Sequence, residues 1–126
     1  MTNAQRITAQ PRQLLGTSPG LALVDVAEPE ICCGSAGIYN VVQPEPAERL
    51  GRRKADNLLV GRPEVIAAGY GGCIQQIRRH AGDADIPVVR PVELLDASCA
   101  ATRVRPAELQ PKAGYFIPVV AIPLTR

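Results

Sequence analysis

The residues of this chain best suited to chemistry are its cysteines, of which Cys32 and Cys33 stand side by side in front of Gly34. Neighbouring side chains point apart in an extended segment, but in a loop flanked by glycines both sulfur atoms can be turned toward one point. Thiolates are soft ligands that select zinc or iron–sulfur clusters. The alternative is that both are small buried hydrophobic side chains, because free cysteine packs well. The pair alone leaves both interpretations open.

Cys73 is the third candidate thiol, and it follows the glycine-rich turn 69–72 at the start of an expected helix. A helix N-terminus lowers the pKa of a thiol and favours the thiolate. In parallel sheets the turns from strand to helix gather at one edge, where ligands usually bind. We therefore expect Cys73 at the same edge as the loop of Cys32 and Cys33. Cys99 lies in a short expected helix without neighbouring glycines and is expected to be a packing residue.

Other chemistry finds little support in the sequence. His80 is the single histidine and is expected at the surface, which removes multi-histidine metal sites. The turn 69–72 resembles a phosphate-binding turn, but Ile74 stands where the dinucleotide fingerprint needs a third glycine, and no Walker lysine follows. The basic residues of 49–54 are expected to be the solvated face of a helix. With no acid–base pair, no nucleophile–histidine pair and no complete metal site, we expect no catalysis by the chain alone.

Length and composition fit one small domain that is not built to bind nucleic acid. The chain has 126 residues, 46% of them hydrophobic, and a net charge of +2. A balanced charge and a shortage of aromatic side chains argue against a basic, base-stacking surface. No apolar run reaches the roughly 18 residues that span a bilayer, and the polar N-terminus has no signal region. We therefore expect a cytoplasmic protein whose cysteines are reduced.

Strands that alternate with helices predict an α/β fold, a small parallel-sheet domain of βαβ units. The expected strands cover residues 21–26, 64–68 and 86–89, and the expected helices cover 4–16, 38–42, about 45–60, a segment from residue 73, and 92–100. We expect the cysteine-rich domain to occupy residues 1–100. Residues 101–126 form a proline-rich tail, whose apolar stretch 115–124 is typical of an edge strand or a disordered segment.

The stretch 32–40, which opens with Cys32, Cys33 and Gly34, resembles the C-terminal cysteine-rich (CCG) region of the glycolate oxidase iron–sulfur subunit. The wider family includes lactate-utilisation iron–sulfur proteins and the heterodisulfide reductase B subunit. Further matches extend the resemblance over residues 4–97: Ala4-Gln5, Gln10-Pro11-Arg12, Gln43-Pro44-Glu45, Arg53-Lys54, Gly72-Cys73 and Pro91-Val92-Glu93-Leu94-Leu95-Asp96.

The resemblance implies electron transfer inside a larger complex. The family's full subunit carries ferredoxin-type [4Fe–4S] clusters and partners flavin-bearing subunits that oxidise glycolate to glyoxylate, and in the heterodisulfide reductase relatives the cysteine-rich module itself binds an iron–sulfur cluster. The metal ligands that the resemblance implies are Cys32, Cys33 and Cys73, with Gly34 and Gly72 beside the cofactor. The implied partners are flavin-bearing glycolate oxidase subunits and a ferredoxin-like iron–sulfur segment or chain. Such a complex can place the protein peripherally at the inner membrane.

The chain departs from the family pattern at several positions. The family's leading cysteine would fall before Met1, and Tyr70 stands at the first position of the Cys-x-x-Cys motif that Cys73 completes. Asn3 and Arg90 stand where the glycolate oxidase members usually have histidine. Three thiolates remain where a cubane cluster normally takes four, so the ligand set is incomplete. The absent leading segment suggests an N-terminally truncated fragment.

Two functional hypotheses follow. In the first, the chain is the C-terminal module or a fragment of a glycolate-oxidase-type iron–sulfur electron-transfer subunit, and supplies thiolate ligands or a docking surface. In the second, it is an inactive fragment or a stand-alone interaction domain with buried cysteines and no cofactor. Both depend on whether the sulfur atoms of Cys32, Cys33 and Cys73 meet at one edge of the fold.

Overall fold

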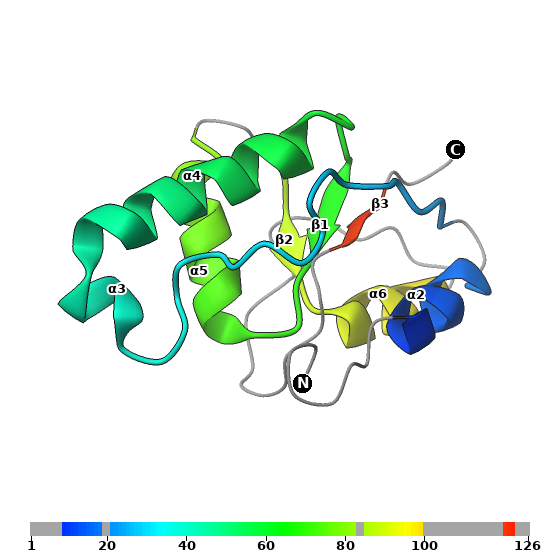
Figure 1. Cartoon of the computed structure of the whole chain (residues 1–126). Helices are drawn as coiled ribbons and strands as arrows, with labels where there is room; N and C mark the ends of the chain where they lie inside the picture. Colours follow the sequence, from blue (N-terminus) through cyan, green and yellow to red (C-terminus); the bar gives the residue numbers. More distant parts are fainter. Residues whose placement is uncertain (1–8, 19–20, 83–84, 100–119, 123–126) are drawn as a thin grey trace.

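The computed structural model describes residues 9–18, 21–82, 85–99 and 120–122 (Figure 1). Short strands lie at the centre of the fold with helices on both sides. The elements in chain order are α2 (Ala9–Gly16), α3 (Tyr39–Val42), α4 (Pro44–Leu59), β1 (Val65–Ala67), α5 (Gly71–His80), β2 (Val88–Val89), α6 (Pro91–Cys99) and β3 (Val120–Ile122).

The sheet has the strand order β2-β1-β3, with β1 in the middle. β1 pairs in parallel with β2, where Ile66 lies opposite Val88, and antiparallel with β3, where Ile66 lies opposite Ala121. The segment β1–α5–β2 is a βαβ unit, so the α/β fold with a parallel strand pair is confirmed. All three residues of β1 are fully buried, as a central strand covered on both faces requires.

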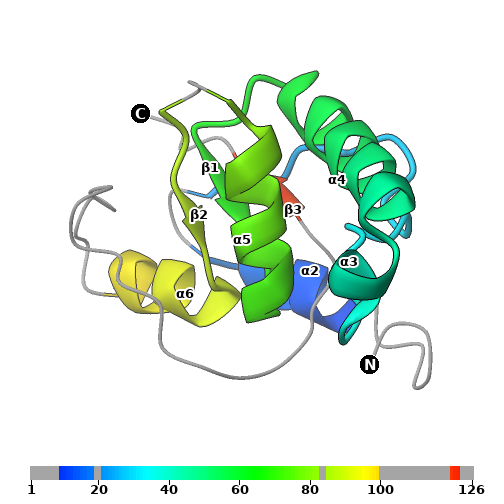
Figure 2. The ribbon, with the colours of Figure 1, turned by 90° about the vertical axis from the view of Figure 1, so that its left-hand side faces the viewer.

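Successive strand residues point into two different cores. Ile66 and Val88 belong to a cluster that includes side chains of α4 and α5, whereas Val65, Ala67 and Val89 belong to a cluster with side chains of α2 and α6. This alternation follows from the two-residue period of a strand. Figure 2 shows the resulting layers, with α4 and α5 on one side of the strands and α2 and α6 on the other. No helix in the described part of the chain is long and apolar enough to cross a bilayer.

The expected strand over residues 21–26 is wrong. The segment contains only isolated bridges, at Leu21 and Val24, and forms no regular strand. Its apolar side chains nevertheless pack inward, some into each of the two cores. Both edges of β1 are already taken by β2 and β3, so no free edge of the central strand remains for this segment to pair with.

The other expected elements appear with bounds that differ by a few residues. The helix expected over 4–16 is described from Ala9 onward, and residues 4–8 lie outside the described part. Within the stretch 115–124, Val120–Ile122 forms the edge strand β3, and the rest of the stretch lies outside the described residues. The division into a domain of residues 1–100 and a tail of 101–126 stays a prediction.

Two glycines let the loop that carries the adjacent cysteines pack tightly between α4 and α5. Gly34 has a φ of +80°, and a Cβ added there would lie 2.4 Å from the carbonyl oxygen of Ala47 in α4. A Cβ added at Gly72, in the first turn of α5, would lie 2.7 Å from the Oγ atom of Ser35. The loop therefore touches both helices where side chains are absent, and this close packing sets the position of the residues around Gly34.

We predict that Gly34→Ala lowers the free energy of unfolding by about 3 kcal/mol, because it combines an unfavourable positive φ with a clash against the backbone of α4. Gly37→Ala is the matched control, since Gly37 also has a positive φ, of +57°, but has open space where a Cβ would lie. It should cost only about 1 kcal/mol. Urea unfolding followed by circular dichroism measures both, and equal losses would contradict the proposed packing constraint.

Candidate functional site

Cys33 and Cys73 lie side by side in the folded chain. Their Sγ atoms are 2.7 Å apart although the residues are 40 positions apart in sequence. Cys33 comes from the loop before α3, and Cys73 is the third residue of α5, just after β1 ends. Both side chains are buried, with only 4% and 6% of the two residues exposed, and both belong to the core cluster beneath α4 and α5. The structure thus brings together two of the three thiols singled out in the sequence.

Cys32 stays outside this contact. Its side chain is exposed, and its Sγ atom accepts a hydrogen bond from the backbone N–H of Gly34 at 3.4 Å. Among residues 9–18, 21–82, 85–99 and 120–122, no group of three or more His, Cys, Asp or Glu side chains is placed to hold a metal ion. The adjacent cysteines therefore differ in environment, one facing solvent and the other the core. Cys99 is the last residue of α6, and its packing role stays a prediction.

The hydrogen bond between the two buried thiols shifts their pKa values in opposite directions. The hydrogen bond with Cys73 lowers the pKa of Cys33 below the ordinary thiol value, although burial opposes this, and a backbone hydrogen bond at Ser35 and the charge of Lys54 add to the effect. The same hydrogen bond, together with burial and the charge of Cys33, raises the pKa of Cys73. The pKa of Cys73 is thus shifted upward in this contact, opposite to the direction expected from its place at a helix N-terminus. The shared hydrogen bond therefore favours ionisation of Cys33 before Cys73.

Lys54 places a buried cation close to these thiols. The residue is only 2% exposed, and its Nζ atom donates a hydrogen bond to the carbonyl oxygen of Pro29 at 2.7 Å. Burial lowers the pKa of Lys54, and the negative charge of Cys33 is the largest effect that opposes this shift. An ammonium group beside thiolates offsets part of the cost of burying negative charge.

The expectation that the basic residues of 49–54 all lie on a solvated helix face is wrong for Lys54. The exposed face carries Arg49, Arg52 and Arg53, the last of which forms an ion pair with Glu28. Lys54 lies instead on the buried side of α4, together with Ala47, Gly51, Ala55 and Leu58. These positions follow the helical period of the apolar stripe, so the spacing of Lys54 within that stripe is the signal that could have identified it.

His80 is also buried rather than at the surface, and the expectation of a surface histidine is wrong. Its side chain is 4% exposed and its ring fills the space left by Gly51, where an added Cβ would lie 2.4 Å from the histidine Cδ2 atom. The Nδ1 atom lies 3.6 Å from a carboxylate oxygen of Glu48, and the buried Nε2 atom has no hydrogen-bond partner. A glycine on the facing helix, which sequence spacing does not reveal, accounts for this burial.

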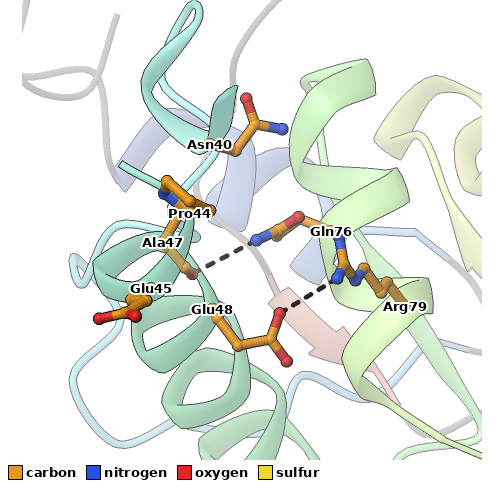
Figure 3. A pocket seen from close by; sticks show the side chains of 7 residues that line it. All are labelled: Asn40, Pro44, Glu45, Ala47, Glu48, Gln76 and Arg79. Atoms are coloured by element: carbon orange, nitrogen blue, oxygen red, sulfur yellow. Dashed lines mark hydrogen bonds and ion pairs between the residues drawn. The ribbon is translucent and has the colours of Figure 1, made fainter. Parts of the chain in front are cut away.

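Figure 3 shows a pocket between α3, α4 and α5 whose lining residues include neither Cys33 nor Cys73. Gln76 donates a hydrogen bond at 3.3 Å to the carbonyl oxygen of Ala47, the same oxygen that Gly34 packs against, and Arg79 lies 3.3 Å from Glu48. These contacts tie α5 to α4 and so hold the two helices on either side of the cysteine loop. The pocket is lined by Asn40, Pro44, Glu45, Ala47, Glu48, Gln76 and Arg79.

The described donor atoms do not complete an iron–sulfur site by themselves. A [4Fe–4S] cluster takes four cysteine thiolates, whereas this part of the chain offers a converging pair and one exposed thiol. Two thiolates on one zinc ion, each at about 2.3 Å, would lie roughly 3.8 Å apart. The observed 2.7 Å is shorter, so binding a metal between Cys33 and Cys73 would require the loop to move away from α5.

Comparisons with known proteins agree with these features. The family of CCG cysteine-rich domains matches residues 1–78. Lactate utilization protein A of Exiguobacterium sp. is 32% identical over 98 residues, which cover 76% of this chain and 40% of that protein. An uncharacterized iron–sulfur protein of Methanococcus maripaludis is 29% identical over 104 residues, covering 76% of this chain and 21% of that protein. The glycolate oxidase iron–sulfur subunit of Escherichia coli is 34% identical over 73 residues, covering 58% of this chain and 18% of that subunit.

The matched segment contains the Cys-Cys-Gly loop, Cys73 and the helices that hold them, so the similarity covers the whole site. The chain spans between 18% and 40% of the length of these relatives. No solved structure matches it. The chain therefore belongs to the family of CCG cysteine-rich domains.

Proposed function

We propose that the chain acts as the cysteine-rich module of an iron–sulfur electron-transfer subunit of the glycolate-oxidase type and is not catalytic alone. The observation that carries this proposal is the convergence of the Cys33 and Cys73 sulfur atoms, 2.7 Å apart and drawn from segments 40 residues apart. Buried polar atoms that meet in this way are favourable only if their charge is balanced, and Lys54 supplies a compensating cation. The relatives named as iron–sulfur proteins support the same role.

In this proposal Cys33 and Cys73 are metal ligands, and Cys32 is a third ligand that turns inward. Gly34 and Gly72 lie next to these ligands in the sequence, and their lack of side chains lets the loop pack against α4 and α5. An iron–sulfur cluster bound there would supply one-electron transfer, and its remaining ligand would come from outside the described residues. Because the chain covers only part of each relative, we assign that ligand to a ferredoxin-like iron–sulfur segment or chain.

The proposed partners are flavin-bearing subunits that oxidise glycolate to glyoxylate and pass electrons to the iron–sulfur subunit. The proposed location is the cytoplasm, with peripheral attachment at the inner membrane through the complex. The name of the Escherichia coli relative, glycolate oxidase iron–sulfur subunit, supports partners from a glycolate oxidase complex, whereas the flavin and the location rest on the family resemblance alone.

A second candidate function is a stand-alone interaction domain whose cysteines only pack. The observation that favours it is a set of exposed apolar side chains at α3: Ile38 is 73% exposed, Val41 77% and Val42 60%. Cys33 and Cys73 also lie in a hydrophobic core cluster, as inert thiols would. The two candidates differ in what the loss of a thiol does to bound iron.

We predict that the chain, expressed together with a ferredoxin-like partner chain and reconstituted anaerobically with iron and sulfide, gives a brown complex containing iron and acid-labile sulfide. Cys33→Ser and Cys73→Ser should each lose most of the iron bound through this chain, because each removes one of the convergent ligands. Cys99→Ser is the matched control and should retain it. If the two core-cysteine variants fold and keep the full iron content, the interaction-domain candidate is favoured.

We predict that Lys54→Met shifts the ionisation of the cysteine pair to higher pH, because the ammonium group lowers the pKa of both Cys33 and Cys73. The measurement is the ultraviolet absorbance of thiolate against pH in a Cys32→Ser, Cys99→Ser background, where the buried pair supplies the thiols. Arg53→Met is the control, since Arg53 lies on the exposed face and pairs with Glu28. A thiolate titration that Lys54→Met leaves unmoved would show that Lys54 does not act on the thiols.

A further inference from the structure

We propose that Cys33 and Cys73 form a reversible disulfide bond, which makes the pair a thiol–disulfide redox site as well as a pair of candidate ligands. This inference goes beyond the proposed metal-binding role and does not depend on it. It rests on the contact between the two sulfur atoms and on the separation of Cys32 from that contact.

The two sulfur atoms are already close to bonding distance. At 2.7 Å they lie nearer than the roughly 3.5–4.0 Å at which nonbonded heavy atoms pack, and a disulfide bond is about 2.05 Å long. Gly34 lets the loop pack against α4 and Gly72 lets it pack against α5, so the loop is held close to Cys73 and little backbone movement is needed to close the gap. The structure therefore presents Cys33 and Cys73 as a preorganised pair.

Cys32, the other thiol of the loop, is not placed to compete with Cys33 for Cys73. Cys32 is exposed, and its Sγ atom accepts a hydrogen bond from Gly34 rather than facing the buried pair. Adjacent cysteines also point to different sides of the loop here, one to solvent and one to the core. Oxidation should therefore link Cys33 to Cys73 and leave Cys32 as a free thiol.

The reaction needs an external oxidant, and a small organic disulfide, R–S–S–R, is sufficient. The Cys33 thiolate attacks one sulfur of the oxidant, forms a mixed disulfide and releases one thiolate, R–S⁻. The Cys73 thiol gives its proton to that thiolate and then attacks the Cys33 sulfur, which releases the second R–S⁻, and this thiolate takes up from solvent the proton that Cys33 lost on ionising. Overall, two protein thiols are oxidised to one disulfide and the oxidant is reduced to two R–SH molecules.

The disulfide would change what the site can bind. It uses both buried sulfur atoms, which are then no longer thiolates and cannot ligate a metal. It also joins the cysteine loop covalently to the first turn of α5 across 40 residues of chain, which restricts the unfolded state. Oxidation would therefore exclude metal from the pair and stabilise the metal-free fold.

The test uses the reduced, metal-free full chain treated with 2-hydroxyethyl disulfide, then with N-ethylmaleimide, and digested with trypsin without reduction. Trypsin leaves Cys32 and Cys33 on the peptide of residues 13–49 and Cys73 on the peptide of residues 55–78. We expect these two peptides to be linked in most molecules, and two of the four cysteines to become inaccessible to alkylation. Dithiothreitol should reverse both changes.

Two variants identify the partner of Cys73. In Cys32→Ser the linked peptides should persist, because Cys33 is then the sole cysteine of the peptide 13–49. In Cys73→Ala the link should disappear. Should Cys73→Ala fail to fold, the Cys32→Ser peptide map decides the question by itself.

Three results would overturn the proposal: all four cysteines still alkylated after oxidation, a link that Cys32→Ser abolishes, or links found between different molecules only. Metal uptake is measured separately on the reduced protein. A chain that takes up iron but forms no disulfide would leave the proposed function standing, and a chain that forms the disulfide but takes up no iron would leave this inference standing.

Discussion

The structure of this site depends on one close approach, the backbone of the cysteine loop lying directly against the backbone of α4 at Gly34. Any side chain at that position would meet the carbonyl oxygen of Ala47. The same oxygen accepts a hydrogen bond from Gln76, which ties α5 to α4 on the same side of the sheet. Because Gly72 removes a second side chain where the loop meets α5, the loop is set between the two helices, and Cys33 is carried to Cys73.

This placement gives the site two properties that oppose each other. The thiols are buried in an apolar cluster, which disfavours negative charge, yet they hydrogen-bond to each other beside a buried ammonium group, which favours one thiolate. The result is a pair in which Cys33 ionises more readily than Cys73. Such a pair suits reactions that need two neighbouring thiols, such as metal ligation and disulfide formation. The pair is buried, whereas Cys32 is exposed to solvent.

Local patterns in the sequence predicted the α/β fold, most helices and the placement of Cys73 at a strand-to-helix turn. The failures at residues 21–26 and His80 are cases in which a distant part of the chain decides. Residues 21–26 have the composition of a strand but form only isolated bridges, and their side chains pack into the two cores on either side of the sheet. His80 is buried because Gly51 on another helix makes room for its ring. Lys54 was assigned to the surface by its charge, although its position in the apolar stripe of α4 pointed inward.

The central claim is that Cys33 and Cys73, and not Cys32, form the close thiol pair. A trivalent arsenical such as phenylarsine oxide tests this most directly, because one arsenic atom bonds two thiols only when they are near each other. In the reduced Cys32→Ser, Cys99→Ser protein, where Cys33 and Cys73 are the remaining cysteines, the account predicts tight uptake of one arsenical per chain with both thiols lost to alkylation. A folded protein of this composition that binds no arsenical, and leaves both thiols separately reactive, would contradict it.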